Sequence, residues 1–160
     1  MLRKLIYLTL IILLASEMSF ASVPLVGDMA PDFTLTSING EEVTLSKYRG
    51  SVVVLGLFHN CNPCMNQATK MQKILAEGKT KAIFIGVNTW GSTRKDLVDY
   101  LNRFKLKITF PYLLDPSRSV DREYRQRFMP TVIVIDKDGV IRYRGSATPK
   151  EFLEDIINKL

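Results

Sequence analysis

The chain of 160 residues is 46% hydrophobic and 24% charged, which is the composition of an ordinary globular protein. The length favours a single domain, and the composition excludes a largely disordered chain. The formal net charge of +6 comes from scattered basic residues. Because no basic stripe interleaved with stacking aromatics is present, the sequence predicts no nucleic-acid surface.

The first 21 residues have the pattern of an export signal. Two basic residues precede an apolar run from Leu5 to Ala15, and Ser19-Phe20-Ala21 ends in the small residues of a cleavage site. The apolar run is shorter than the roughly 20 residues that span a bilayer. We therefore expect a signal peptide over 1–21 and a domain over 22–160, with an uncleaved N-terminal anchor as the alternative. The predicted location is the periplasm or the outer face of the cytoplasmic membrane.

Apolar periodicity predicts an alternation of strands and helices after the leader. In chain order we expect a hairpin over 32–36 and 42–45, a strand over 51–58, a helix over 65–76, a strand over 82–87, a helix over 96–104, an extended segment over 110–113, a helix over 117–128, strands over 131–136 and 140–143, and a helix over 149–160. Buried strands that alternate with helices imply parallel pairing, and the hairpins add antiparallel pairing. The fold class is therefore α/β, with a central mixed sheet covered by helices on both faces.

Cys61 and Cys64 are the two cysteines of the chain, and they form a Cys-x-x-Cys motif between a buried strand and a helix. A disulfide across two residues closes almost no loop and is a poor structural staple, so a redox role is favoured. The N-terminus of a helix favours a thiolate. We therefore expect Cys61 to be the exposed nucleophile and Cys64 the shielded resolving thiol. Pro63 suits the first turn, where its missing N–H is not needed.

Two other interpretations of this motif compete with the redox one. The thiols could be inert, or they could bind zinc or copper. Structural zinc needs four protein ligands, whereas Cys61, Cys64 and His59 offer at most three. His59 is therefore more simply interpreted as a neighbour of the dithiol.

Met129-Pro130-Thr131 is a second candidate part of the site. Pro130 immediately precedes a strongly β-branched strand, where proline occurs at the beginning or edge. A cis Met129–Pro130 bond would leave the Met129 backbone free to pair with an incoming peptide. The local sequence alone favours an ordinary trans proline, and only the combination with Cys-x-x-Cys favours the cis form.

These motifs together resemble the thioredoxin superfamily. Residues 27–33 and 45–50 further resemble the TlpA/ResA-like branch of exported thioredoxins, which borders the peroxiredoxins (the AhpC/TSA redoxin group). The similarity extends from Gly27 to Leu160. The resemblance implies a thioredoxin-like fold with an inserted strand and helix over 93–113. It also implies Cys61 as nucleophile, Cys64 as resolving thiol and a cis Pro130.

The chain departs from the family pattern at the redox pair. Asn60 stands where the family usually has a large residue, and Leu55 and Gln67 occupy the two places where many relatives carry a buried acid. Glu41 and Glu42 are candidate substitutes for that acid. These departures bear on the rate and the redox potential of the exchange.

The resemblance implies a protein disulfide oxidoreductase that needs no cofactor beyond its own dithiol. Its partners would be proteins bearing disulfides or thiols and a membrane thiol–electron donor, and we expect a monomer. A reductase role is expected, for example in c-type cytochrome maturation, although an oxidase would use the same atoms.

Two alternatives come from other classes. A thiol peroxidase with antioxidant activity would carry a Pro-x-x-x-Thr/Ser-x-x-Cys pattern, but the matching positions hold Val54 and Phe58. A copper-delivery protein of this fold would carry Cys-x-x-x-Cys and a distant histidine, which this chain lacks.

The remaining candidates have plain interpretations. Phe58, His59, Asn60 and Pro63 are accessory candidates beside the dithiol, with Phe58 expected in the core. Trp90 is expected to be a packing or rim residue. The arginines between Arg118 and Arg127 are expected on a solvated helix face, with substrate docking as the alternative.

Overall fold

The computed structural model describes residues 22–160, so the predicted signal peptide lies outside the described residues. One sheet of seven strands has the order β2-β1-β5-β4-β3-β6-β7. Its strands are β1 (Thr34–Ser37), β2 (Glu42–Thr44), β3 (Val53–Phe58), β4 (Ile83–Asn88), β5 (Tyr112–Leu114), β6 (Thr131–Ile135) and β7 (Ile141–Ser146). The helices are the 3₁₀ turn η1 (Leu45–Tyr48), α2 (Asn62–Glu77), α3 (Arg94–Leu101), α4 (Ser119–Tyr124) and α5 (Lys150–Asn158).

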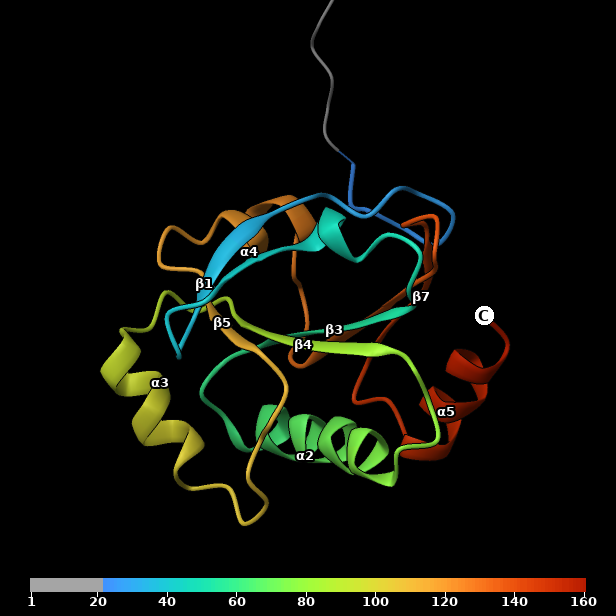
Figure 1. Cartoon of the computed structure of the whole chain (residues 1–160). Coiled ribbons are helices and arrows are strands. Elements are labelled where there is room, and N and C mark those ends of the chain that lie inside the picture. Colours follow the sequence, from blue (N-terminus) through green and yellow to red (C-terminus); the bar gives the residue numbers. More distant parts are fainter. Residues whose placement is uncertain (1–21) are drawn as a thin grey trace, which may run out of the picture.

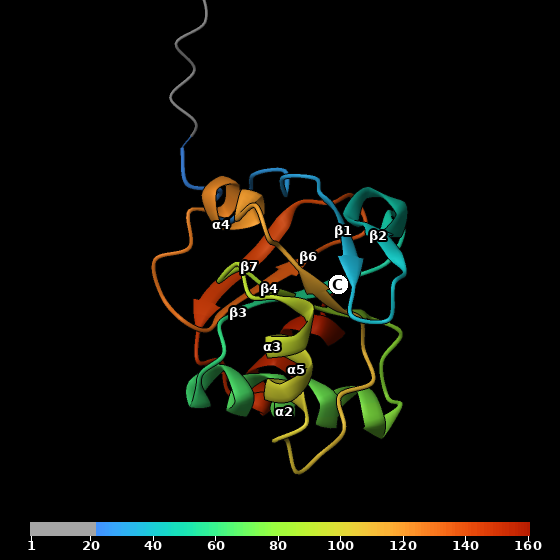
Figure 2. The same ribbon diagram turned by 90° about the vertical axis from the view of Figure 1, so that its left-hand side faces the viewer.

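The sheet is mixed, as the sequence predicts. β3 pairs in parallel with β4 and antiparallel with β6, and β4 pairs in parallel with β5. The hairpin β1–β2 and the terminal strand β7 add antiparallel pairs. Helices α2, α3 and α5 lie on one face, whereas α4 and η1 lie on the other with the N-terminal lead-in, residues 22–33 (Figures 1 and 2). The α/β, thioredoxin-like fold class is confirmed.

Strand β3 lies inside the sheet, between β4 and β6, and is buried on both faces. Val54 and Phe58 belong to the core under α2 and α5, whereas Val53, Leu55 and Leu57 belong to the core under α4. Successive side chains of a strand point to opposite faces, so an uninterrupted apolar run suits a strand with two covered faces. The Cys-x-x-Cys loop directly follows the C-terminal end of this strand.

All four α-helices differ from their predicted bounds, and the difference is largest for α4. The helix expected over 117–128 ends at Tyr124, where Arg125 adopts a left-handed conformation with φ of 44°. The segment from Arg125 to Pro130 is therefore a loop, and the prediction of helix beyond Tyr124 is wrong. Helix α3, expected over 96–104, begins earlier because Thr93 and Asp96 form a capping box, and it ends earlier, at Leu101. None of the helices in residues 22–160 combines the length and the hydrophobicity of a membrane span.

Candidate active site

The two cysteines lie where strand β3 passes into α2. Cys61 is the N-cap residue of α2, in an extended conformation, and Pro63 is in the first turn. Cys61 is partly exposed, whereas Cys64 has no exposed surface. Both are free thiols, and the Sγ of Cys61 donates a hydrogen bond to the Sγ of Cys64 at 3.0 Å. The pair therefore offers one sulfur to a partner and keeps the second behind it, in position to form an intramolecular disulfide.

The surroundings of Cys64 favour its neutral form. Burial raises the pKa of the Cys64 thiol well above its usual range, and the hydrogen bond with Cys61 adds to the shift. The backbone N–H of His59 donates to the Cys64 Sγ at 3.2 Å, which offsets part of this effect. Cys64 is therefore a thiol at neutral pH and needs to lose a proton before it can attack.

Aromatic side chains form the wall behind the dithiol. The Oη of Tyr100 donates to the carbonyl O of Cys61 at 2.8 Å, which ties α3 to the first turn of α2. The ring of Phe58, fully buried, packs on Tyr112 with 5.8 Å between centroids. Burial also raises the pKa of Tyr100 far above its usual range, so this hydroxyl remains a hydrogen-bond donor. Phe58 is a core residue, as expected, and it lies in the same apolar cluster as Cys64.

Asn60 is held by a polar network that sequence reasoning missed. The side-chain amide of Asn88, buried at the end of β4, donates to the Asn60 Oδ1 at 2.8 Å. The Asn60 amide in turn donates to the hydroxyl of Ser92 at 3.1 Å. The loop before Cys61 is thereby fixed by hydrogen bonds. A polar residue at the end of the buried run over 82–87 was the signal that could have identified Asn88.

His59 packs against a surface aromatic residue. Its ring lies 4.5 Å from that of Trp90, and the guanidinium of Arg118 lies 5.8 Å from the Trp90 ring centroid. Trp90 is 58% exposed, so it is a rim residue beside the redox loop. Burial lowers the pKa of His59, so its imidazole is neutral at pH 7. Within residues 22–160 no three His, Cys, Asp or Glu side chains gather as metal ligands would.

The Met129–Pro130–Thr131 segment lies at the same end of the sheet as the dithiol. The Met129–Pro130 peptide bond is cis, and Thr131 pairs with Leu57 near the end of β3. The Thr131 hydroxyl donates to the carbonyl of Phe128 at 2.6 Å. Phe128 is 70% exposed and Met129 39% exposed, whereas Pro130 is buried. An exposed apolar loop thus flanks the redox loop.

Gln126 is a second residue of this loop that the sequence did not indicate. Its amide donates to the carbonyl O of Leu57 at 2.9 Å, and its side-chain oxygen accepts from the hydroxyl of Thr89. These bonds connect the loop after α4 to the ends of β3 and β4. The position lay within a predicted helix, where a glutamine carries no signal of this kind.

The two positions at which the family resemblance implies a buried acid hold no acid here. Leu55 is a buried core residue, and Gln67 is buried with no hydrogen bond from either amide atom to any residue described. Glu41 and Glu42 are exposed at the β1–β2 hairpin, which β5 and β4 separate from β3. Neither glutamate can substitute for a base beside Cys64, so that expectation is wrong.

Comparisons with known proteins agree with this geometry. Residues 26–144 match the AhpC/TSA family. ResA, a thiol-disulfide oxidoreductase of Geobacillus kaustophilus, is 33% identical over 118 residues, which cover 73% of this chain and 67% of ResA. The thioredoxin-like protein YneN of Bacillus subtilis is 29% identical over 128 residues, or 78% of this chain and 75% of YneN.

A solved structure with the same fold is also assigned to thiol–disulfide exchange. The crystal structure of a Chlorobium tepidum protein assigned as thiol:disulfide interchange protein DsbE superposes with a TM-score of 0.75 at 31% identity. The match covers 85% of this chain and 97% of that one. This chain therefore belongs to the AhpC/TSA family and is a thiol–disulfide oxidoreductase of the ResA/DsbE type with the redox pair Cys61 and Cys64.

Proposed function

We propose that the chain is an exported reductase of partner-protein disulfides. The observation that carries this proposal is the unequal burial of the two sulfurs, with Cys61 partly exposed and Cys64 fully buried 3.0 Å behind it. A client disulfide can therefore reach only one of the two thiols. Export is supported by the pattern of residues 1–21.

The reaction follows from that arrangement. The Cys61 thiolate attacks one sulfur of the client disulfide, a mixed disulfide forms, and the other client sulfur leaves as a thiolate. Cys64 then loses its proton and attacks the Sγ of Cys61. This second step forms the Cys61–Cys64 disulfide, releases the reduced client, and moves two electrons from the protein to the client. The backbone of Met129, a partly exposed residue, is proposed to hold the client chain during both steps.

The electrostatics of the site support the reducing direction. A strong disulfide donor stabilises its reduced form as a thiolate. Here His59 is neutral at pH 7, because burial lowers its pKa, and burial keeps Cys64 protonated. With neither group stabilising a thiolate, the dithiol gives up its electrons more readily. A membrane-embedded thiol carrier is the proposed electron donor, and haem-attachment cysteines of c-type cytochromes are the proposed clients.

The reduction potential of residues 22–160 tests the direction. The domain would be equilibrated with glutathione and with dithiothreitol buffers, and Cys61→Ser would serve as the control that cannot form the internal disulfide. We expect a value near or below thioredoxin's roughly −270 mV. A value near the roughly −120 mV of DsbA would contradict the reductase role.

Incubation of the same samples with hydrogen peroxide distinguishes a peroxidase from a disulfide reductase. Val54 and Phe58, at the positions of the peroxidatic pattern, are buried in the core and carry no hydroxyl. We therefore expect consumption of hydrogen peroxide no faster than by an unstructured dithiol peptide. Rapid consumption that depends on Cys61 would replace disulfide reduction by peroxide reduction as the function.

A further inference from the structure

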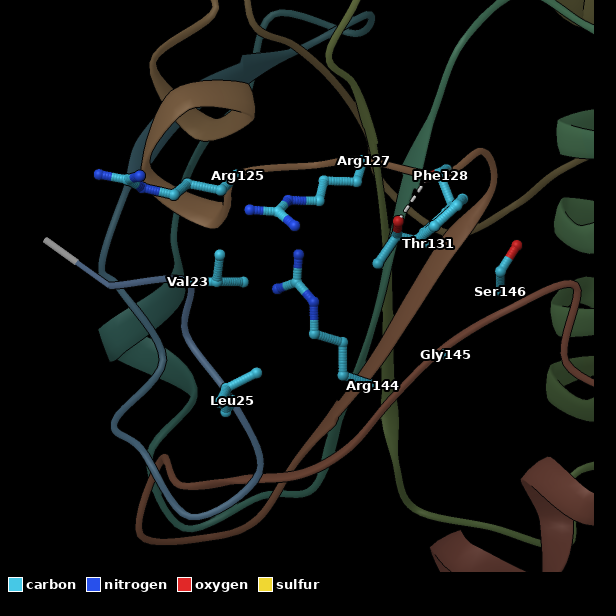
Figure 3. A pocket seen from close by; sticks show the side chains of 9 residues that line it. All are labelled: Val23, Leu25, Arg125, Arg127, Phe128, Thr131, Arg144, Gly145 and Ser146. Carbon is cyan, nitrogen blue, oxygen red and sulfur yellow. Dashed lines mark hydrogen bonds between the residues drawn. The ribbon is translucent and has the colours of Figure 1, made fainter.

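A pocket of about 540 Å³ extends from the Met129–Pro130 loop along the outer strand β7. At the end near the loop it is lined by Phe128, Thr131 and Ser146, and Thr131 is the residue paired with Ser146 in the β6–β7 ladder (Figure 3). At the far end it is lined by Val23 and Leu25 of the lead-in. The pocket is therefore continuous with the loop that flanks the dithiol.

Guanidinium groups converge in this pocket. Figure 3 shows the side chains of Arg127 and Arg144 pointing toward one another beside Val23, whereas that of Arg125 points away. Arg144 is held in place because it donates to the carbonyls of Tyr124 and Pro24. Among residues 22–160 no carboxylate forms a salt bridge with any of the three arginines. Two like charges that face each other without an anion make a site for a carboxylate, which guanidinium binds with two parallel hydrogen bonds.

The adjoining strand edge is open. The lead-in pairs with β7 only at its beginning, where Gly27 and Asp28 bond to Ile141. From Tyr143 to Ser146 the outer edge of β7 pairs with no strand in the described part of the chain. An unpaired edge accepts an extended peptide as an added strand, with side-chain pockets giving specificity.

We propose that this pocket binds an acidic side chain of the client, carried on an extended segment next to the client cysteine. The inference rests on the proposed disulfide exchange at Cys61 and adds a preference among clients. Arg127 and Arg144 are the specificity residues, and Phe128 supplies an apolar surface for the residues between the acid and the cysteine. Arg127 thereby acquires the docking role that the sequence offered only as an alternative to a solvated helix face, whereas Arg144 was not among the arginines that the sequence indicated.

The sheet register sets the spacing of the acid. Arg144 pairs with Ile133, four positions after Met129 along the strand. At about 3.3 Å per extended residue this separation is roughly 13 Å. A client chain bound at Met129 would therefore place its acid about three to five residues from the cysteine.

Peptides that differ only in the position of two glutamates, with a control peptide that carries glutamines in their place, test this preference. Each contains one cysteine activated as a mixed disulfide with 5-thio-2-nitrobenzoate, and two glutamates placed either adjacent to the cysteine or about four residues away, on either side. The Cys64→Ser variant attacks the peptide sulfur through Cys61, forms the peptide mixed disulfide and releases the coloured thiolate, whose absorbance is followed. We expect the spaced acidic peptide to react about tenfold faster than a glutamine peptide at low salt.

Arg127→Gln in the Cys64→Ser background is expected to reduce this preference to about twofold or less. Arg103→Gln is the matched control, since it removes one positive charge from a separate hollow beside Met65 and Asn66 and should leave the preference unchanged. The binding of cysteine-free peptides, measured by fluorescence anisotropy, should show the same order of affinities. Equal rates for acidic and glutamine peptides would overturn the inference while leaving the exchange function intact. Absence of thiolate release from every peptide would instead contradict the proposed function itself.

A membrane surface is the competing partner for these arginines. Vesicles of phosphatidylcholine with and without phosphatidylglycerol, sedimented with the domain, provide the comparison. An Arg127-dependent gain in binding to the anionic vesicles, with no preference among the peptides, would assign the pocket to lipid headgroups and overturn the client inference. Peptide selectivity that survives in the presence of the vesicles supports it.

Discussion

The hydroxyl of Tyr100 donates a hydrogen bond to the carbonyl oxygen of Cys61, with 2.8 Å between the two oxygens. The same carbonyl accepts the backbone N–H of Met65 at 2.9 Å, so Cys61 is bound both within α2 and from α3. This contact fixes the residue that carries the attacking sulfur through its main chain and does not involve its side chain. Tyr100 is thus a positioning residue for Cys61.

Removal of that hydroxyl should cost little stability. We expect Tyr100→Phe to lower the free energy of unfolding by about 1 kcal/mol, because the Cys61 carbonyl keeps its helical hydrogen bond. Tyr100→Ala should lower it by about 3–5 kcal/mol, since it also leaves a cavity beside Phe104. Urea unfolding of the reduced domain measures both values. Equal losses in the two variants would show that the hydroxyl, rather than the packing of the ring, dominates.

Gln67 offers a test of a buried polar group. Its side chain makes no hydrogen bond to the rest of the described chain, and the residue is 1% exposed. We expect Gln67→Met to raise the free energy of unfolding by about 1 kcal/mol, because the variant keeps the shape and removes the desolvation cost of the amide. Chemical denaturation provides the measurement, and Asn66→Ala, at the exposed neighbouring position of the same helix, is the surface control. A loss of stability in the Met variant would mean that the amide is satisfied in solution.

The pH dependence of the reduction potential should report Cys64. Burial raises the pKa of its thiol to about 12, so this proton remains bound in the reduced protein up to strongly alkaline pH. At least one proton therefore enters with the two electrons throughout the range near neutrality. We expect the potential to fall by at least about 30 mV for each unit of pH between about pH 6 and pH 9. A potential that becomes independent of pH below about pH 9 would contradict the raised pKa.

His59 should make the fold less stable in acid. Burial lowers its pKa in the folded state below the ordinary value of 6.5, so the unfolded chain binds the proton more tightly. The stabilising contribution is complete above the unfolded pKa and is lost as the pH falls through the folded one. We expect the free energy of unfolding to decrease from about pH 7 to about pH 5, and the decrease to be smaller in His59→Gln. An identical pH profile for the variant would exclude His59 as the source.

Local sequence patterns determined the main elements of this protein. The apolar run over 51–58 specified a strand buried on both faces, and helical spacing after Cys64 specified α2. Such patterns are readable because each reports how one segment alternates between covered and exposed faces. The Cys-x-x-Cys spacing similarly placed both sulfurs on one helical turn, which is a property of local geometry.

Tertiary structure alone decided the surroundings of that pair. Asn88 reaches Asn60 because β4 lies beside β3, and Arg127 meets Arg144 because β7 lies outside β6. Likewise, α4 ends at Tyr124 because the following residues bond to the ends of β3 and β4 through Gln126. The order of strands in a sheet depends on the packing of the whole core, so no single segment encodes it. The chemistry of the dithiol could therefore be predicted from the sequence, whereas its supporting network and its charged neighbour could be identified only in the folded chain.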